Sequence, residues 1–300
     1  MAKILTDDTG KAMVVELEKI SGYMENTQGT LDQLHTADKT SLVSAINELH
    51  DVYKVFKVLK EGSGAGLHNS IFRGKNLGSA VTGAQWSAIA SGTFDDLWIG
   101  DFWHIGGVNW RIADFDYFYR TGDQGSGCLT HHVMIVPDTA LYNARMNATN
   151  TTEGGYMGSE MYTTNLEQAK TQIDTAFGAG HILKHREFFP NAFTGYKPTG
   201  AIWVDSTVEL MTEHMCCGAR FFGVPHDPAV EPPLYVHTAS MTQFSLFRLQ
   251  RDLLITPNRA WYWLRDVVSA SRFAYCTQGG VGTYIASVVG GVRPAFPIAA

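Results

Sequence analysis

The chain has few cysteines, and their spacing excludes the common cysteine frameworks. Four cysteines, at 128, 216, 217 and 276, are spread over 300 residues without a C-x-x-C pair. Neither a disulfide-stapled secreted domain nor a cysteine-rich metal site has this pattern. We therefore expect free thiols in a chain that is made in a reducing cytosol.

Long apolar runs and blocks of like charge are also absent. No segment reaches the roughly 18 consecutive apolar residues that predict a membrane span. The first eight residues lack the apolar core of a signal peptide, so we expect any external destination to be reached by lysis or assembly. The net charge is −6 and is spread along the chain. This balance indicates neither a nucleic acid nor a membrane as partner.

The sequence has no recognisable metal or catalytic motif. His131 and His132 are adjacent, so on a strand they point to opposite faces and cannot both bind one ion. There is no G-x-S-x-G elbow for a nucleophilic serine. The glycine-rich stretches at 278–282 and 289–291 do not precede a helix, as a phosphate-binding loop would. We expect no metal, no cofactor and no enzymatic activity.

One pair of carboxylates keeps a catalytic alternative open. Asp114 and Asp116 lie two residues apart on a possible strand, near Trp110 and Tyr117. Two carboxylates beside aromatic rings are typical of glycoside hydrolases. They equally suit sugar binding without cleavage, or a solvated rim. A hydrolase that acts on cell-wall polysaccharide is therefore the alternative to a binding protein.

The chain is rich in glycine and aromatic residues, and its composition changes near residue 60. Hydrophobic residues make up 45%, aromatic residues 12%, and there are 30 glycines, a composition typical of a globular, turn-rich protein. Residues 1–60 lack this character and predict helix. Residues 61–69 form a glycine-rich linker, and residues 70–300 form one large domain.

The N-terminal region carries a narrow apolar stripe after Asp38, which is a good helix N-cap. Its members are spaced 4, 3, 4 and 3 residues apart, which suits coiled-coil packing better than a helix that lies on its own domain. We assign these residues to oligomerisation: Leu42, Ile46, Leu49, Tyr53 and Phe56. The isoleucine between two leucines permits a dimer or a trimer. An ordinary amphipathic helix remains the alternative.

The large domain is expected to be α+β, with helices among many short strands. Strands 102–105 and 108–112 flank Gly106-Gly107 as a hairpin, and 133–136 is a buried strand. Helices are expected at 84–90, at 165–177 with a Thr164–Glu167 capping box, and at 207–217 with a Ser206–Glu209 box. Further strands are expected at 201–204, 261–268, 273–277 and 292–298.

The last forty residues are expected to combine a core with a display surface. Trp261, Trp263, Leu264 and Phe296 are the expected core residues, because a chain end this rich in large rings is tied down. Between them, aromatic and polar residues alternate in a way that suits a binding surface. The candidate ligand-binding residues are Arg272, Tyr275, Thr277, Gln278 and Tyr284. The alternative is that these rings all belong to the core.

Several segments resemble the C-type-lectin-like domains of phage fibre and baseplate proteins. The likeness covers roughly 70–300, and another segment, 37–49, resembles the short coiled coils of trimeric phage fibres. The segments that carry the domain likeness are 100–103 and 108–113 in the first hairpin, 131–137 and 205–211 in the middle, and 263–266, 273–275 and 291–296 at the end. Some relatives diversify residues just before the terminal strand, which points to 272–284 as the ligand-contacting stretch.

The resemblance implies a compact α+β domain, with the non-catalytic form of the formylglycine-generating-enzyme fold, whose first and last strands pair. It implies a homotrimer that residues 1–60 attach to other virion proteins of the tail, baseplate or capsid head. It further implies binding of a host-surface receptor or glycan, and a location in the virion after synthesis in the host cytoplasm. A capsid decoration protein without a receptor is a further alternative.

The sequence also departs from the families that share this broad fold. Formylglycine-generating oxidases need a cysteine pair in the C-terminal part, whereas Cys276 stands without a near neighbour. The calcium motifs of lectins, Glu-Pro-Asn and Trp-Asn-Asp, are missing. Neither that oxidase activity nor calcium-dependent sugar binding is therefore expected.

Overall fold

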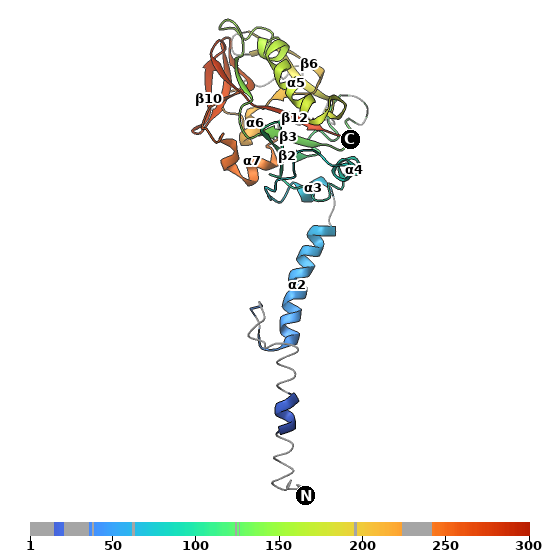
Figure 1. Ribbon diagram of the computed structural model, residues 1–300. Helices are drawn as coiled ribbons and strands as arrows, with labels where there is room; N and C mark the ends of the chain where they lie inside the picture. The colour runs from blue at the N-terminus through green and yellow to red at the C-terminus, as the bar shows by residue number, and fades with distance from the viewer. Residues whose placement is uncertain are drawn as a thin grey trace. The chain divides into compact units, whose positions relative to one another are not determined.

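The structure is a computed structural model in which the chain divides into two compact units, Met1–Gly62 and Ser63–Ala300 (Figure 1). It describes residues 15–20, 36–37, 39–61, 64–123, 125, 127–194, 197–223 and 242–300. Within these ranges, the side chains of 52–61, 190–194 and 197–201 are not described. Each unit is treated by itself below.

The N-terminal unit contains the expected helix. Helix α2 spans Leu42–Glu61, and residues 15–20 are also helical. Its first turn is capped by Ser41, whose Oγ accepts a hydrogen bond from the Ser44 N–H at 3.0 Å. The expected cap, Asp38, lies outside the described residues. A serine is as good an N-cap as an aspartate, so the helix begins three residues later than the sequence indicated.

The apolar stripe of α2 is exposed within its own unit. Leu42, Ile46 and Leu49 are 52%, 54% and 56% exposed in the part of that unit that the structure describes. Tyr53 and Phe56 lie in the same helix, but their side chains are outside the described part. No helix in the part that the structure describes is long and apolar enough to cross a membrane.

The expected linker at 61–69 is too long. Helix α3 spans Ala65–His68, and His68 is buried, with its ring stacked on Trp98 at 4.4 Å. The Asn69 side chain exchanges hydrogen bonds with the backbone of Phe115, at 2.9 and 2.8 Å. These contacts place 65–69 in the C-terminal unit, because a buried imidazole and a doubly bonded amide anchor the segment there.

The C-terminal unit is a mixed α/β structure with several sheets (Figure 1). The first sheet has the strand order β1 (Phe102–Ile105), β2 (Val108–Phe115), β3 (Val133–Pro137), β12 (Pro294–Ile298) and β7 (Glu209–Leu210). The second has the order β10 (Gly280–Ile285), β9 (Arg272–Thr277), β8 (Tyr262–Ser269), β11 (Val289–Val292) and β4 (Tyr142–Arg145). A two-stranded sheet pairs β5 (His185–Thr194) with β6 (Lys197–Ser206).

Short helices connect and cover these sheets. They are α4 (Gly83–Ser91), a π-helical segment (Met161–Asn165), α5 (Leu166–Phe177), α6 (Glu213–Cys217) and α7 (Ser245–Leu249), with 3-10 turns at Ala179–His181 and Arg251–Leu254. The prediction of a helix at 84–90 is confirmed. So is the hairpin around Gly106 and Gly107, whose positive φ angles of 60° and 79° suit a two-residue hairpin turn.

The chain end belongs to both large sheets. Strand β11 pairs with β8 and β4, and β12 pairs with β3 and β7, with only Arg293 between them. Arg293 is buried and donates hydrogen bonds to the carbonyl oxygens of Pro137, Leu254 and Leu253, at 2.8, 3.0 and 3.0 Å. The terminal segment therefore ties the two sheets together. The first strand pairs with β2 and not with the last strand, so the expected first–last pairing is wrong.

Two helix predictions need correction at their starts. The expected apolar face of α5 is buried at Leu166, Ala169, Ile173 and Phe177, but no side chain caps this helix. A π-helical turn precedes it and supplies the backbone acceptors, so the Thr164–Glu167 box does not form.

The helix expected at 207–217 begins only at Glu213, behind a Thr212–Met215 capping box. Residues 209–210 form β7 instead, because Glu209 is drawn into a buried ion pair with Arg265. Tertiary contacts override the local helix signal there.

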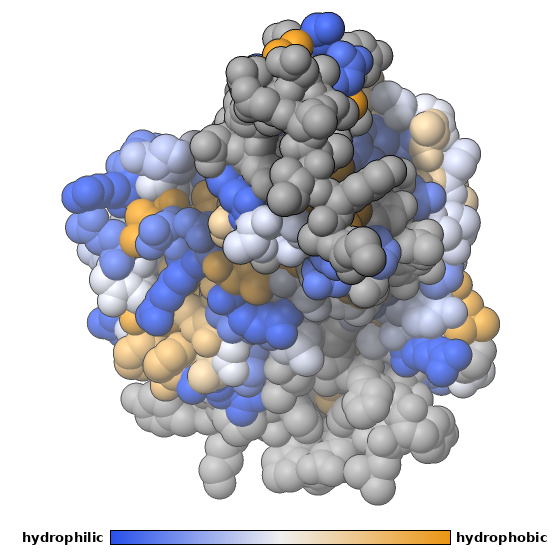
Figure 2. Space-filling model, turned by 90° about the horizontal axis from the view of Figure 1, so that it is seen from below, coloured by the Kyte–Doolittle hydropathy of each residue, from blue (hydrophilic) through white to orange (hydrophobic). Residues whose placement is uncertain are grey.

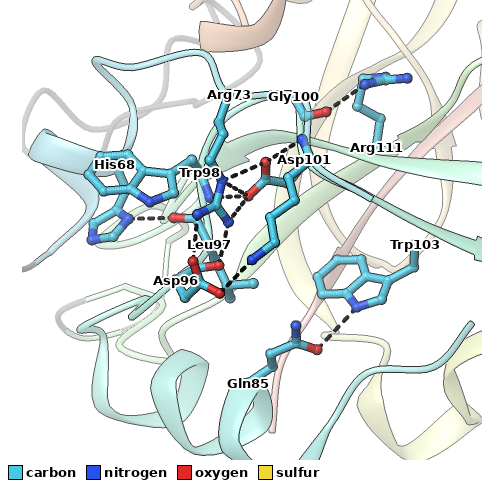
Figure 3. A network of polar contacts seen from close by, with 11 residues as sticks. His68, Arg73, Gln85, Asp96, Leu97, Trp98, Gly100, Asp101, Trp103 and Arg111 are labelled. Atoms are coloured by element: carbon cyan, nitrogen blue, oxygen red, sulfur yellow. Dashed lines mark hydrogen bonds and ion pairs between the residues drawn. The ribbon is translucent and has the colours of Figure 1, made fainter. Parts of the chain in front are cut away.

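A buried carboxylate organises the loops before β1 (Figure 3). Asp101 accepts hydrogen bonds from the Arg73 guanidinium, at 2.7 Å for Nη2, and from the backbone N–H groups of Lys75 and Trp98, both at 2.8 Å. Because these donors satisfy the charge, the carboxylate is stable without solvent. Elsewhere the surface is mixed: on the face in Figure 2, hydrophobic residues lie in small groups between hydrophilic ones.

Candidate functional site

Three aromatic rings meet at the surface of the second sheet. The Trp261 ring is stacked on Tyr284 with 5.6 Å between centroids and 14° between planes, and it lies edge-on to Tyr275 at 5.2 Å. The two tyrosine rings are 5.9 Å apart. Tyr284 is 41% exposed, and the other two rings are half-buried. We call Trp261, Tyr275 and Tyr284 the aromatic patch.

Glycines on neighbouring strands make room for these rings. Gly282 lies opposite Tyr275 in the β9–β10 hairpin, and a Cβ atom there would be 2.6 Å from the tyrosine Cζ. A Cβ atom at Gly290 on β11 would be 2.1 Å from the indole ring of Trp261. Such distances are far inside van der Waals contact, so any side chain at either position would displace a ring. The two glycines let the rings lie over the strands.

The structure brings most of the expected ligand-binding residues to one edge of this sheet. Tyr275, Thr277 and Tyr284 occupy one face of the β9–β10 hairpin, because alternate residues of a strand share a face. Gln278 is exposed in the turn that joins the two strands. Arg272 is exposed but lies on the opposite face, where its Nη1 is 3.5 Å from the Thr283 carbonyl oxygen.

Trp261 is the patch residue that the sequence reasoning placed wrongly. It was expected in the core with Trp263, Leu264 and Phe296, which are all fully buried. Trp261 lies just before β8, at the end of the central strand of the sheet, and its ring is only half-buried. Its spacing of two residues from Trp263 puts both on one face, and only its place at the strand end exposes it.

The two carboxylates of the hydrolase alternative do not form a pair. Asp114 is buried on β2 and accepts a hydrogen bond from the Ser245 N–H at 2.8 Å, and burial raises the pKa of its carboxyl to about 6. Asp116 follows the strand with a φ of 56°, so the expectation of a shared strand face is wrong. Its carboxylate contacts His131 Nδ1 at 2.8 Å and the His132 N–H at 3.0 Å. Both carboxylates hold loops in place.

The four cysteines are free, as expected. Cys216 and Cys276 are buried, and burial raises the pKa of the Cys216 thiol well above its usual value. The two thiols interact with each other, and a hydrogen bond from Cys216 lowers the pKa of the Cys276 thiol to about 7.

A buried ionic cluster is the second feature with chemical potential, and the sequence reasoning missed it. His185 and Glu187 on β5, Glu209 on β7 and Arg265 on β8 are all buried. Arg265 Nη2 lies 3.1 Å from Glu187 Oε2, and its Nη1 forms an ion pair with Glu209 Oε2. The histidine Nε2 lies 3.8 Å from Glu187 Oε1 and 3.6 Å from Glu209 Oε1.

Predicting the cluster from the sequence would require knowing which strands, distant along the chain, lie next to one another in the fold. Glu209 was placed on a helix, and Arg265 was treated as part of a family-like segment. His185 and Glu187 are two residues apart, so on a strand both side chains point to the same face. This spacing is the only local feature of the sequence that indicates the cluster. Burial lowers the pKa of His185 to about 4, opposed by the charge of Glu187.

Comparisons with known proteins returned nothing: no family model, no curated protein and no solved structure matches this chain.

Proposed function

We propose that this chain is a structural and adhesion protein of a phage virion. Residues 1–60 attach it to other virion proteins and form a homotrimer. The C-terminal unit is a lectin-like head that binds a host-surface receptor or glycan, with the aromatic patch as its contact surface. The sequence resemblance to phage lectin-like domains supplies the virion context, and the aromatic patch supplies the site.

The observation that carries the proposal is a group of three contacting aromatic rings on the second sheet, of which Tyr284 is exposed and the other two are half-buried. Trp and Tyr supply a large contact area while losing few rotamers on binding. Here Trp261 and Tyr275 are held by contacts with each other and with Tyr284, and Tyr284 is 41% exposed. A sugar ring has one apolar face and hydroxyl groups at its rim. It would pack on the rings and form hydrogen bonds with Thr277 and Gln278.

The test of the site compares full-length variants for binding to host cells and to purified host-surface polysaccharide. Tyr275→Ala and Tyr284→Ala should each weaken binding at least tenfold, because aromatic hot-spot residues are worth about 2 kcal/mol or more. Phe221→Ala is the matched control, since this ring is also exposed but lies outside the patch. Equal binding by both tyrosine variants and the control would place the site elsewhere.

The exposed stripe of α2 supports the oligomeric part of the proposal. Three apolar side chains at coiled-coil spacing remain more than half exposed within their own unit. Copies of the same helix would cover them most simply, because a symmetric assembly pairs like with like.

Light scattering on the full chain tests this assembly. The wild type should have the mass of a trimer. Ile46→Asp should give the mass of a monomer, because the trimer would have to bury a charge between its helices. Glu48→Asp, which keeps the charge, is the control. A monomeric wild type would contradict the proposed assembly.

A further inference from the structure

The ionic cluster holds three lone-pair-bearing atoms that face one another without a donor between them. His185, Glu187 and Glu209 each offer one ligand atom within 4.8 Å of the other two. His185 Nε2, Glu187 Oε1 and Glu209 Oε1 have no hydrogen-bond partner. The separations of 3.6 and 3.8 Å from the imidazole nitrogen are too long for hydrogen bonds. Buried polar atoms are normally satisfied, so this arrangement calls for a further group.

The tautomer of His185 follows from its other nitrogen. Nδ1 lies 3.4 Å from the carbonyl oxygen of Leu183, which can only accept a hydrogen bond. A hydrogen bond to this oxygen requires the proton on Nδ1, and in that tautomer Nε2 presents its lone pair to the two carboxylates. A backbone carbonyl behind a histidine is the usual means by which proteins orient a metal-binding imidazole.

Arg265 contacts only one oxygen atom of each of the two carboxylates. Its guanidinium contacts Oε2 of Glu187 and Oε2 of Glu209, which leaves each Oε1 free to face the imidazole. Two carboxylates and one guanidinium leave a formal charge of −1 in a buried site. Such a charge is costly without a counter-charge.

We propose that His185 Nε2, Glu187 Oε1 and Glu209 Oε1 bind one divalent transition-metal ion of the Zn²⁺ type. Such ions take imidazole nitrogen and carboxylate oxygen at about 2.0–2.2 Å, so neighbouring ligands lie about 3.4 Å apart in a tetrahedral site. The two distances from the imidazole nitrogen, 3.6 and 3.8 Å, exceed this value by only a few tenths of an ångström. This site goes beyond the proposed function and does not depend on it.

Space for a fourth ligand lies beside the cluster. A small pocket with room for about one water-sized sphere is lined by residues that include Phe118, Met134, His185, Glu209 and Met215. A water molecule there would complete four-coordination. The ring of Phe118 stacks on His185 at 3.8 Å and holds the imidazole plane in place.

The ion would act as a structural clamp. His185 and Glu187 lie at the start of β5, in the two-stranded sheet, and Glu209 lies on β7 at the edge of the first sheet. One ion bound by all three residues fastens the β5–β6 hairpin to the body of the unit. A binding energy of this kind adds directly to the stability of the folded state.

The experiment uses the full-length protein, stripped with a chelator and dialysed against micromolar Zn²⁺, with the bound metal measured by mass spectrometry. The wild type should retain one Zn²⁺ per chain. Zn²⁺ at about 100 times its Kd should raise the Tm by roughly 5–10 °C. Glu187→Gln and Glu209→Gln should each reduce the affinity at least tenfold. His104→Gln removes an exposed histidine outside the cluster and should bind as the wild type does.

The wild-type protein alone also decides the question if the variants fail to fold. Bound Co²⁺ should give the intense visible absorption of a four-coordinate site, and Zn²⁺ should displace it. Uptake of less than about a tenth of an equivalent by the wild type would overturn the proposal. Equal uptake by the His104→Gln and Glu209→Gln variants would also overturn it.

Discussion

Asp266 gives a sharp test of the electrostatics inside the C-terminal unit. Its carboxyl group on β8 is partly buried and accepts a hydrogen bond from the Glu213 N–H at 2.7 Å. The carboxylate of Glu213 is itself buried and accepts hydrogen bonds from the N–H groups of Phe221, Phe222 and Gly223. Burial, reinforced by the negative charge of Glu213, raises the pKa of Asp266 to about 7.

The direction of the pH effect follows from this raised pKa. In the unfolded chain Asp266 ionises near its ordinary value of 3.8, whereas in the folded chain it holds its proton to about pH 7. Its contribution to stability is therefore fully present below pH 4 and is lost as the pH rises to 7. A shift of about three units corresponds to about 4 kcal/mol, and partial exposure reduces this to roughly 2–4 kcal/mol.

Asp266→Asn replaces the carboxyl with a neutral group of the same shape that can still accept from the Glu213 N–H. We expect the variant to match the wild type at pH 4 and to exceed its free energy of unfolding by roughly 2–4 kcal/mol at pH 8. Urea denaturation at five values between pH 4 and 8 measures this difference. Titrating groups that do not contact Asp266 are common to both proteins and cancel in the comparison.

Asp174→Asn, which changes an exposed carboxylate on α5, serves as the control and should leave the pH profile unchanged. A variant at Asp266 that is less stable than the wild type at pH 8 would refute the reasoning. That result would mean that the ionised carboxylate is a net stabilising acceptor in the folded chain.

Two further predictions concern glycine packing and the buried arginine. Gly290→Ala should weaken ligand binding at least several-fold by displacing the Trp261 ring, whereas Gly279→Ala, where a new Cβ meets nothing within 4 Å, should not; titration with the host polysaccharide measures both. Arg293→Met should lower the free energy of unfolding by about 3–5 kcal/mol, because it leaves three buried carbonyl groups without donors. Arg272→Met, which changes an exposed guanidinium, should cost less than about 0.5 kcal/mol in the same denaturation experiment.

The local patterns of the sequence predicted elements well where neighbours in sequence decide the structure. The Gly106-Gly107 turn and the apolar face of α5 depend on residues within one hairpin or one helix. The helix expected at 207–217 failed because its first half is held by a distant partner. Glu209 pairs with Arg265, 56 positions further along the chain, and no local signal reports such a contact.

The candidate sites were likewise predictable only where neighbouring residues decide the structure. Alternation puts Tyr275 and Thr277 on one face of β9, but Arg272 lies on the opposite face, and Tyr284 joins Tyr275 through the pairing with β10, a strand that was not expected. The exposure of Trp261 depends on where β8 begins. The buried cluster joins residues from strands β5, β7 and β8, which belong to three different sheets. Its charged members look like surface residues in the sequence, because only tertiary packing takes them out of water.

The central claim is that the aromatic patch is the surface that contacts the host. Hydroxyl-radical footprinting of the full-length protein, with and without saturating host-surface polysaccharide, tests it most directly. The proposal predicts that the ligand protects Trp261, Tyr275 and Tyr284 from oxidation, while the exposed Phe221 is oxidised at the same rate in both samples. Bound ligand with unchanged oxidation of the three patch residues would contradict it.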